Sequence, residues 1–104
     1  MIGKKIHNLC KKLLPLNRSL TGNGNRQTLK ILKDICGNLK IKEIPSGKKV
    51  FDWTIPDEWN AKNAWIRCPN GKKIAIYKKN NLHLVSYSKK MNVKMSLDQL
   101  EKHL

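Results

Sequence analysis

Hydrophobic residues in the first third of the chain recur at spacings of three and four positions, the pattern of an amphipathic helix. The first such stripe covers residues 2–14 and ends before Pro15, which stops a helix because it lacks a backbone N–H. A second stripe covers residues 26–36 and ends before Gly37, a residue type that readily closes a helix. The pattern therefore predicts two N-terminal helices joined by a polar loop.

Beyond the second helix the hydrophobic period changes from about 3.6 to two, which indicates β-strands. Residues 39–44 alternate between apolar and charged side chains, and the Pro-Ser-Gly sequence at 45–47 is typical of a turn. Residues 50–55 then read as one further strand, which Pro56 ends. We expect two strands here, separated by the turn.

The clearest hairpin signal lies in the second half of the chain. Residues 64–68 and 72–77 flank Asn70-Gly71, a dipeptide that favours tight hairpin turns because both residue types accept a positive φ. Residues 82–87 predict another strand, and residues 93–95 a short extended piece. The strands are expected to form a mainly antiparallel set.

The last residues carry the signature of a helix start. Ser96 and Gln99 have the spacing of a capping box, and Leu97, Leu100 and Leu104 begin an apolar helical face. Because this face is still incomplete at the last residue, we expect residues 1–104 to be a single incomplete domain, the N-terminal portion of a longer one. The predicted fold class is an α+β or α/β fragment, with two N-terminal helices, mainly antiparallel strands with an Asn-Gly hairpin, and a short C-terminal helix.

Length and composition limit the classes of protein to which the chain can belong. A chain of 104 residues with 39% hydrophobic and 28% charged residues fits one small globular domain. No run of 18 apolar residues exists, and lysines interrupt the first 16 residues, so we expect neither a membrane span nor a signal peptide. A cytoplasmic location without a membrane partner is the resulting prediction.

The formal net charge of +15 makes nucleic acid the first partner to consider, because basic side chains that neutralise phosphates release counterions. Only three of the 22 basic residues are arginines, however, and the lysines are spread along the chain as six separate pairs. Specific recognition favours the planar guanidinium group. We therefore expect no specific nucleic-acid partner, and a small basic protein that binds nucleic acid or another acidic partner is the alternative interpretation.

Cysteine and histidine residues are the candidate metal ligands. The cysteines are odd in number and lack paired spacing, which predicts free, reduced and mostly buried thiols. His7 and Cys10 lie three positions apart on the first helix, but a zinc site needs three or four ligands. The other candidates are single residues in separate elements: Cys36, Cys68, His83 and His103. We predict no metal-ligating, catalytic or cofactor-binding residue in this chain.

The loop at residues 21–24, Thr-Gly-Asn-Gly, resembles a phosphate-binding loop because a helix N-terminus offers unpaired N–H groups to an anion. No predicted strand precedes it, and Gln27 stands where the dinucleotide fingerprint has glycine. The favoured interpretation is a structural loop in which Asn23 or Asn25 caps the second helix.

Asp52, Asp57 and Glu58 could be read as carboxylates paired for acid–base chemistry. Aromatic residues surround them, so we expect this region to anchor packing in a core or an interface rather than to catalyse a reaction. The aromatic residues of this predicted cluster are Phe51, Trp53, Trp59 and Trp65.

Two strings of residues are distinctive. They are Arg-Ser-x-Thr-Gly-x-Gly at 18–24 and Phe-Asp-Trp-x-x-Pro-x-Glu-Trp at 51–59. With Asn81-Leu82-His83 and Tyr87-Ser88, they resemble the opening of a bacterial aminopeptidase-like family that carries a domain-of-unknown-function label and often occurs in surface-polysaccharide gene clusters. The resemblance covers essentially the whole chain, although Asn17 stands where the family commonly has cysteine.

This resemblance implies a zinc-exopeptidase-like α/β domain of several hundred residues, whose ligands lie in His, Asp and Glu motifs beyond this chain. The chain is then expected to be a truncated N-terminal segment of a zinc aminopeptidase-like protein, catalytically silent by itself and without a cofactor of its own. Its implied partner is the missing downstream part of the domain or a second copy of the chain.

Overall fold

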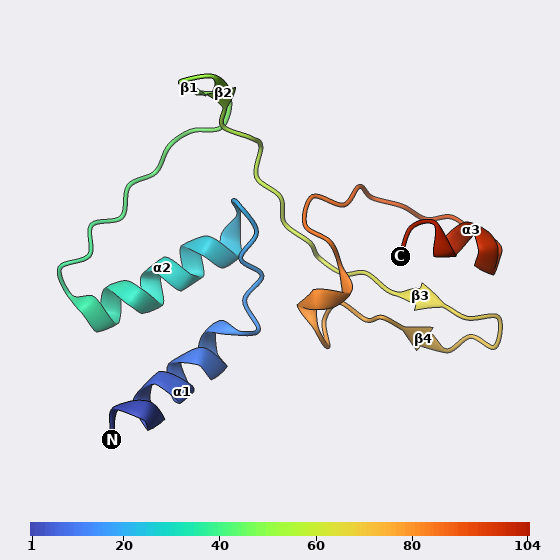
Figure 1. Cartoon of the computed structure of the whole chain (residues 1–104), viewed down its shortest axis with the longest axis horizontal. Helices are drawn as coiled ribbons and strands as arrows, with labels where there is room; N and C mark the ends of the chain where they lie inside the picture. The colour runs from blue at the N-terminus through green and yellow to red at the C-terminus, as the bar shows by residue number, and fades with distance from the viewer.

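The computed structural model describes residues 1–104 and shows the α+β form of the predicted α+β or α/β class. Two helices come first, followed by two antiparallel strand pairs, a 3₁₀ turn and a short last helix (Figure 1). Their bounds are α1 Ile2–Leu13, α2 Asn23–Cys36, β1 Lys49–Val50, β2 Trp53–Thr54, β3 Ile66–Arg67, β4 Lys73–Ile74, η1 Asn81–His83 and α3 Leu97–Glu101. None of the helices is long and apolar enough to traverse a lipid bilayer.

The elements form an open plate that measures 52 × 43 × 18 Å. Helices α1 and α2 lie side by side in one half, β3, β4, η1 and α3 occupy the other, and the β1–β2 pair stands apart from both (Figure 1). The radius of gyration is 17.9 Å, whereas a compact domain of this length has about 13 Å. Only one of the 104 residues, Gly22, is buried. The chain therefore has no hydrophobic core of its own.

Both long helices were predictable from their apolar stripes. Helix α1 ends at Leu13, ahead of Pro15, and α2 ends at Cys36, where the Gly37 amide donates to the Lys33 carbonyl at 2.8 Å. Helix α2 begins at Asn23, earlier than its apolar stripe. Neither helix buries a residue fully. Each stripe is partly covered: Leu9 and Leu32 are half-buried, whereas Ile6 and Ile35 are exposed.

The prediction of one strand over residues 50–55 was wrong, because the chain reverses in its middle. Lys49 pairs with Thr54, and Val50 with Trp53, so Phe51 and Asp52 form a two-residue turn. Phe51 has a φ of 54°, a left-handed conformation that is unfavourable for a bulky side chain. The apolar residues of this segment mark the two sides of a hairpin rather than one face of a strand.

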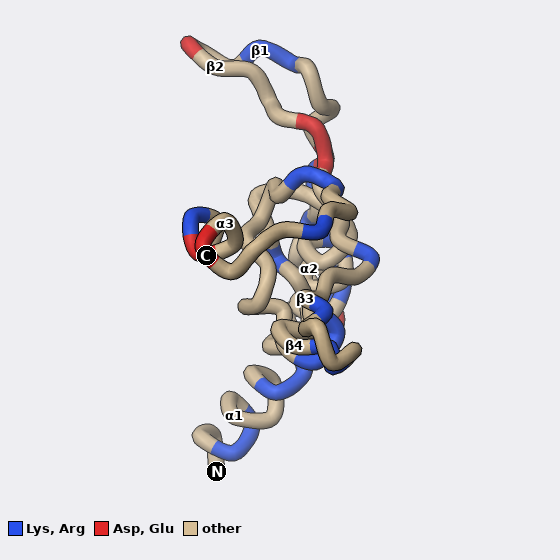
Figure 2. The backbone as a smooth tube through the Cα atoms, turned by 90° about the vertical axis from the view of Figure 1, so that its right-hand side faces the viewer, with Lys and Arg blue, Asp and Glu red and all other residues tan.

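We call residues 45–55 the arm. The predicted turn at 45–47 is present at its base, where the Gly47 amide donates to the Ile55 carbonyl at 2.9 Å. Figure 2 shows the arm projecting away from the rest of the chain. The strand predicted over residues 39–44 is absent: this segment runs extended toward the arm, and no second strand pairs with it.

The predicted Asn-Gly hairpin is confirmed as β3–β4, with Ile66 opposite Ile74. Its turn differs in detail from the expectation. Pro69 and Asn70 occupy the centre of a turn that the Gly71 amide closes onto the Cys68 carbonyl at 2.9 Å, and of these residues only Gly71 has a positive φ, of 81°. Proline presets the first central position, and glycine supplies the left-handed residue that follows.

The strand predicted over residues 82–87 was wrong. This region forms η1, which starts where the Asn80 side chain accepts the Leu82 amide at 3.0 Å, and then turns again before Ser88. No strand forms at residues 93–95 either. A period of two does not form a ladder where no neighbouring backbone is available for pairing.

The capping box at the last helix is confirmed. Ser96 Oγ accepts the Gln99 amide at 3.3 Å, and Gln99 Oε1 accepts the Ser96 amide at 3.0 Å. The apolar face that follows is uncovered, and Leu97 and Leu104 are both exposed.

Candidate functional site

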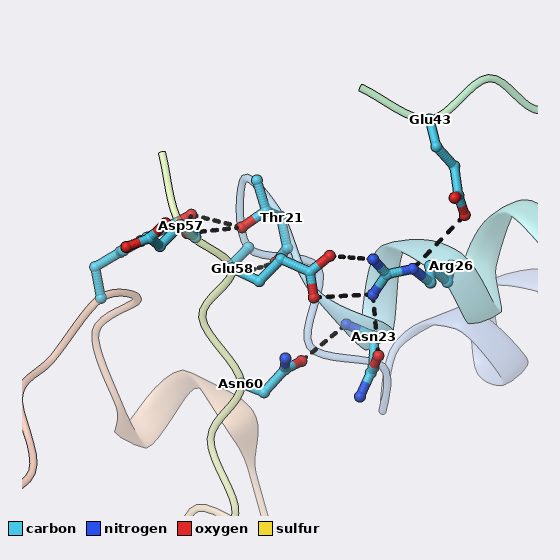
Figure 3. A network of polar contacts seen from close by, with 9 residues as sticks. Thr21, Asn23, Arg26, Glu43, Asp57, Glu58 and Asn60 are labelled. Carbon is cyan, nitrogen blue, oxygen red and sulfur yellow. Dashed lines mark hydrogen bonds and ion pairs between the residues drawn. The ribbon is translucent and has the colours of Figure 1, made fainter. Parts of the chain in front are cut away.

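Most long-range polar contacts of the chain converge on one place, where the start of α2 meets the segment that follows the arm (Figure 3). Hydrogen bonds and ion pairs there connect residues that are about 30 to 66 positions apart. We call this network the clasp, and its members are Thr21, Asn23, Arg26, Asp57, Glu58, Asn60 and Tyr87.

An ion pair forms the centre of the clasp. Arg26, in the first turns of α2, binds both carboxylate oxygens of Glu58, with Nη1 3.0 Å from Oε2 and Nη2 on Oε1. The same guanidinium donates to Asn23 Oδ1 at 3.1 Å, and its Nε lies 3.9 Å from Glu43 Oε1. The hydrogen bond from Arg26 lowers the pKa of Glu58, so this carboxylate is ionised and fully engaged rather than available as a general acid.

A side chain from the same segment caps α2. The Asn23 amide donates to Asn60 Oδ1 at 2.8 Å, so the expectation that Asn23 or Asn25 caps this helix was wrong. The cap residue is Gly22, and a Cβ there would lie 2.6 Å from the Trp59 carbonyl oxygen. Because Trp59 and Asn60 occupy the space before the helix, this loop holds a protein segment where a phosphate loop would hold an anion.

The other side of the clasp is aromatic. The Tyr87 hydroxyl donates to the Asp57 carbonyl at 3.2 Å and lies 2.7 Å from Thr21 Oγ1. Its ring stacks on Trp59 with centroids 6.0 Å apart, and Trp59 Nε1 donates to the Ser88 carbonyl at 3.0 Å. These contacts fix residues 57–60 between the first loop and the last third of the chain.

The predicted aromatic cluster does not form. Trp59 stacks on Tyr87 of the clasp, whereas Phe51 and Trp53 lie on the arm, and Trp65 lies beside β3 with Lys73 Nζ 4.0 Å from its ring centroid. These residues are close in sequence, but the extended backbone between them carries them apart.

The cysteines are free, as predicted, but the expectation that they are mostly buried was wrong: Cys10 and Cys36 are exposed, and Cys68 is half-buried. His7, next to Cys10 on α1, is also exposed. No three His, Cys, Asp or Glu residues come together in a group that could hold a metal ion. The residues of this chain therefore do not offer the three or four ligands that a zinc ion needs.

Glu58 makes the clasp sensitive to acid. Because its pKa is lower in the folded chain than in the unfolded chain, its stabilising contribution is full above the unfolded value and is lost as the pH falls through the folded value. We expect the clasp to open only at a pH below the range in which a glutamate ordinarily titrates. The indole N–H resonance of Trp59 reports this opening, and Glu58→Gln should remove the acid-dependent step. An identical acid transition in Glu58→Gln would contradict this role.

Sequence reasoning missed the roles of Asn60 and Tyr87, because nothing local marks a side chain that caps a helix 37 positions away. The distinctive strings did carry a signal. Arg-Ser-x-Thr-Gly-x-Gly at 18–24 contributes one side of the clasp, and the end of the string at 51–59 contributes the other.

Comparisons with known proteins agree with this geometry. A Clostridium acetobutylicum protein named "Putative polysaccharide biosynthesis protein with aminopeptidase-like domain" is 47% identical over 102 residues, which are 98% of this chain and 23% of that protein. The crystal structure of a "putative peptidase" from the same species matches with a TM-score of 0.89 at 46% identity, over 97% of this chain and 24% of the other. The chain thus spans about a quarter of the length of these relatives.

The match to a family of proteins is equally extensive. The family described as "Domain of unknown function (DUF4910)" matches residues 7–101, a range that begins inside α1 and includes α2, the arm, the clasp, the β3–β4 hairpin and α3. The aminopeptidase-like resemblance seen in the strings at 18–24 and 51–59 agrees with the names of the two relatives. The chain belongs to the DUF4910 family.

Proposed function

We propose that this chain is a structural segment of an aminopeptidase-like protein and is catalytically silent by itself. The observation that carries the proposal is the TM-score of 0.89 to one quarter of a "putative peptidase". That likeness means that an open arrangement without a core recurs inside a chain about four times as long. Zinc and the reacting groups then belong to polypeptide outside these 104 residues.

The side chains of the clasp support a structural role. A general base or nucleophile needs a free functional group near its substrate. Both carboxylate oxygens of Glu58 bind Arg26, and Asn60 Oδ1 accepts a hydrogen bond from the Asn23 amide at the start of α2. The clasp therefore fixes the position of residues 57–60, which continue from the arm.

A chimera tests the proposal. It is the C. acetobutylicum relative with its matched segment replaced by this chain, at 47% identity. We expect the isolated chain to hold no zinc and to release no amino acid from aminopeptidase substrates. The chimera should bind zinc and show whatever peptidase activity the unaltered relative shows in the same assay.

Two results would overturn the proposal. One is a tightly held zinc in the isolated chain that disappears on His7→Ala or Cys10→Ala. The other is a chimera that fails to fold while the unaltered relative folds under the same conditions, since the chain would then not replace the segment that it resembles.

A second function, binding of an acidic polymer, is favoured by the net charge of +15. Dispersed lysines act as point charges, so we expect any binding to DNA or RNA to be independent of sequence and to weaken steeply between about 50 and 200 mM salt. Fluorescence anisotropy with matched and scrambled oligonucleotides measures this. A strong preference for one sequence at about 150 mM salt would favour the second function.

A further inference from the structure

The arm carries apolar side chains that contact little else in the chain. Phe51, at its tip, is 99% exposed, and Trp53 beside it is 53% exposed. The arm projects alone in Figure 2, with Lys49 in β1 and Lys48 directly before it. A large aromatic side chain in this position contributes no packing to the fold described above.

The backbone at the tip is also unfavourable for the residue that occupies it. Phe51 is the first of two turn residues and has a positive φ, whereas Asp52 does not. Two-residue hairpin turns with this pattern favour glycine at the first position, because glycine has no Cβ to clash. Strained residues of this kind concentrate at binding sites, where contacts outside the local backbone compensate for the strain.

We propose that the arm docks, through Phe51 and Trp53, into an apolar pocket with an acidic rim on the other three quarters of the longer aminopeptidase-like chain. This inference rests on the proposed function and adds to it the surface and the chemistry of its partner. The pocket accepts the aromatic side chains, and the rim faces Lys48 and Lys49, which are exposed on the β1 side of the arm.

The large exposed area of the chain favours the rest of the longer polypeptide as the partner, because a small interface would leave most of that area uncovered. The chain exposes 9596 Å², about 3,600 Å² more than a compact protein of its size, whereas a standard interface covers only about 800 Å² per partner. The matched crystal structure supplies a chain about four times as long in which nearly the same arrangement exists. A partner within the same polypeptide accounts for both observations.

Charge argues against a second copy as the occupant. Each copy carries +15, so two copies repel one another, whereas an acidic rim attracts the arm. The chemistry of the surface therefore points to an acidic partner of different sequence.

The substitution Phe51→Gly tests the docking because it changes stability in two opposite directions. The backbone becomes less strained, whereas an aromatic side chain is lost. Glycine removes the strain of the positive φ at this position, so the isolated chain should be as stable as before or more stable. In the chimera, loss of a buried phenyl ring should outweigh this gain and lower the unfolding midpoint by several degrees. Phe51→Leu should keep most of the midpoint, and Asp52→Ala, in the same turn, is the matched control that should not change it.

Charge reversal tests the acidic rim. We expect the double substitution Lys48→Glu and Lys49→Glu to lower the midpoint of the chimera at low salt, and to do so much less at about 1 M salt, where surface charges are screened. The isolated chain should show no such loss. A midpoint that does not respond to the reversal would contradict the acidic partner.

The outcomes separate this inference from the proposed function. A folded, active chimera whose midpoint is unchanged by Phe51→Gly would overturn the docking and leave the proposed function intact. A chimera that does not fold would overturn both. Sedimentation that shows a dimer of the isolated chain, abolished by Phe51→Gly, would assign the arm to a second copy and overturn the inference.

Discussion

Replacing Gly24 with alanine is expected to detach the start of α2 from the loop before it. A Cβ at this position would collide with the Asn17 carbonyl oxygen, and backbone rather than a flexible side chain is in the way. Overpacking of this kind typically destabilises by about 1–3 kcal/mol, and we expect the upper end because the helix or the loop must move. The clasp depends on that helix start, so the Trp59 indole resonance should shift to its unfolded position.

Gly3→Ala is the matched control. Gly3 lies within α1, and nothing comes within 4 Å of a Cβ placed there. Alanine should therefore strengthen the helix by roughly 0.5–1 kcal/mol, which circular dichroism at 222 nm would detect as a higher helical signal. If Gly24→Ala left the Trp59 resonance unchanged, the close approach of α2 to Asn17 would be refuted.

The isolated chain is expected to unfold without a sharp transition. Unfolding of a compact protein of this size exposes about 11,000 Å², whereas a chain that already exposes 9596 Å² gains only about 8,000 Å². The slope of unfolding free energy against urea follows this area, so it should be about a third below that of an ordinary domain of this length. Thermal unfolding followed by circular dichroism should be correspondingly broad.

The chimera provides the comparison for this prediction. If the other three quarters of the relative cover the exposed stripes, the segment should unfold together with them in one cooperative step. A reversible two-state transition of the isolated chain above roughly 60 °C would show instead that these residues fold without help.

The elements that could be predicted are those with a local physical cause. Apolar periodicity and Pro15 define α1, Ser96 and Gln99 define the start of α3, and Asn70-Gly71 marks the β3–β4 hairpin. In each case, the residues that decide the structure lie within a few positions of one another.

The predictions that were wrong concern features that depend on residues far apart in the sequence. A strand exists only if another backbone lies beside it, and residues 39–44 and 82–87 have alternating or apolar patterns without such a neighbour. The clasp was hidden for the same reason, since Arg26 and Glu58 are 32 positions apart. The sequence drew attention to residues on each side, in the strings at 18–24 and 51–59, but did not predict that they meet.

The cap that Asn60 supplies to α2 affects the order in which the chain becomes structured. Closing a loop of 37 residues has an entropic cost of about 3 kcal/mol. The Asn23 amide therefore donates to Asn60 Oδ1 only after residues 57–60 have docked against the start of α2. During synthesis on a ribosome, α2 therefore emerges with a frayed first turn that later residues repair. In native-state hydrogen exchange, the Asn23 amide should exchange with the opening of residues 57–60, whereas amides in the middle of the helix should exchange with the helix itself.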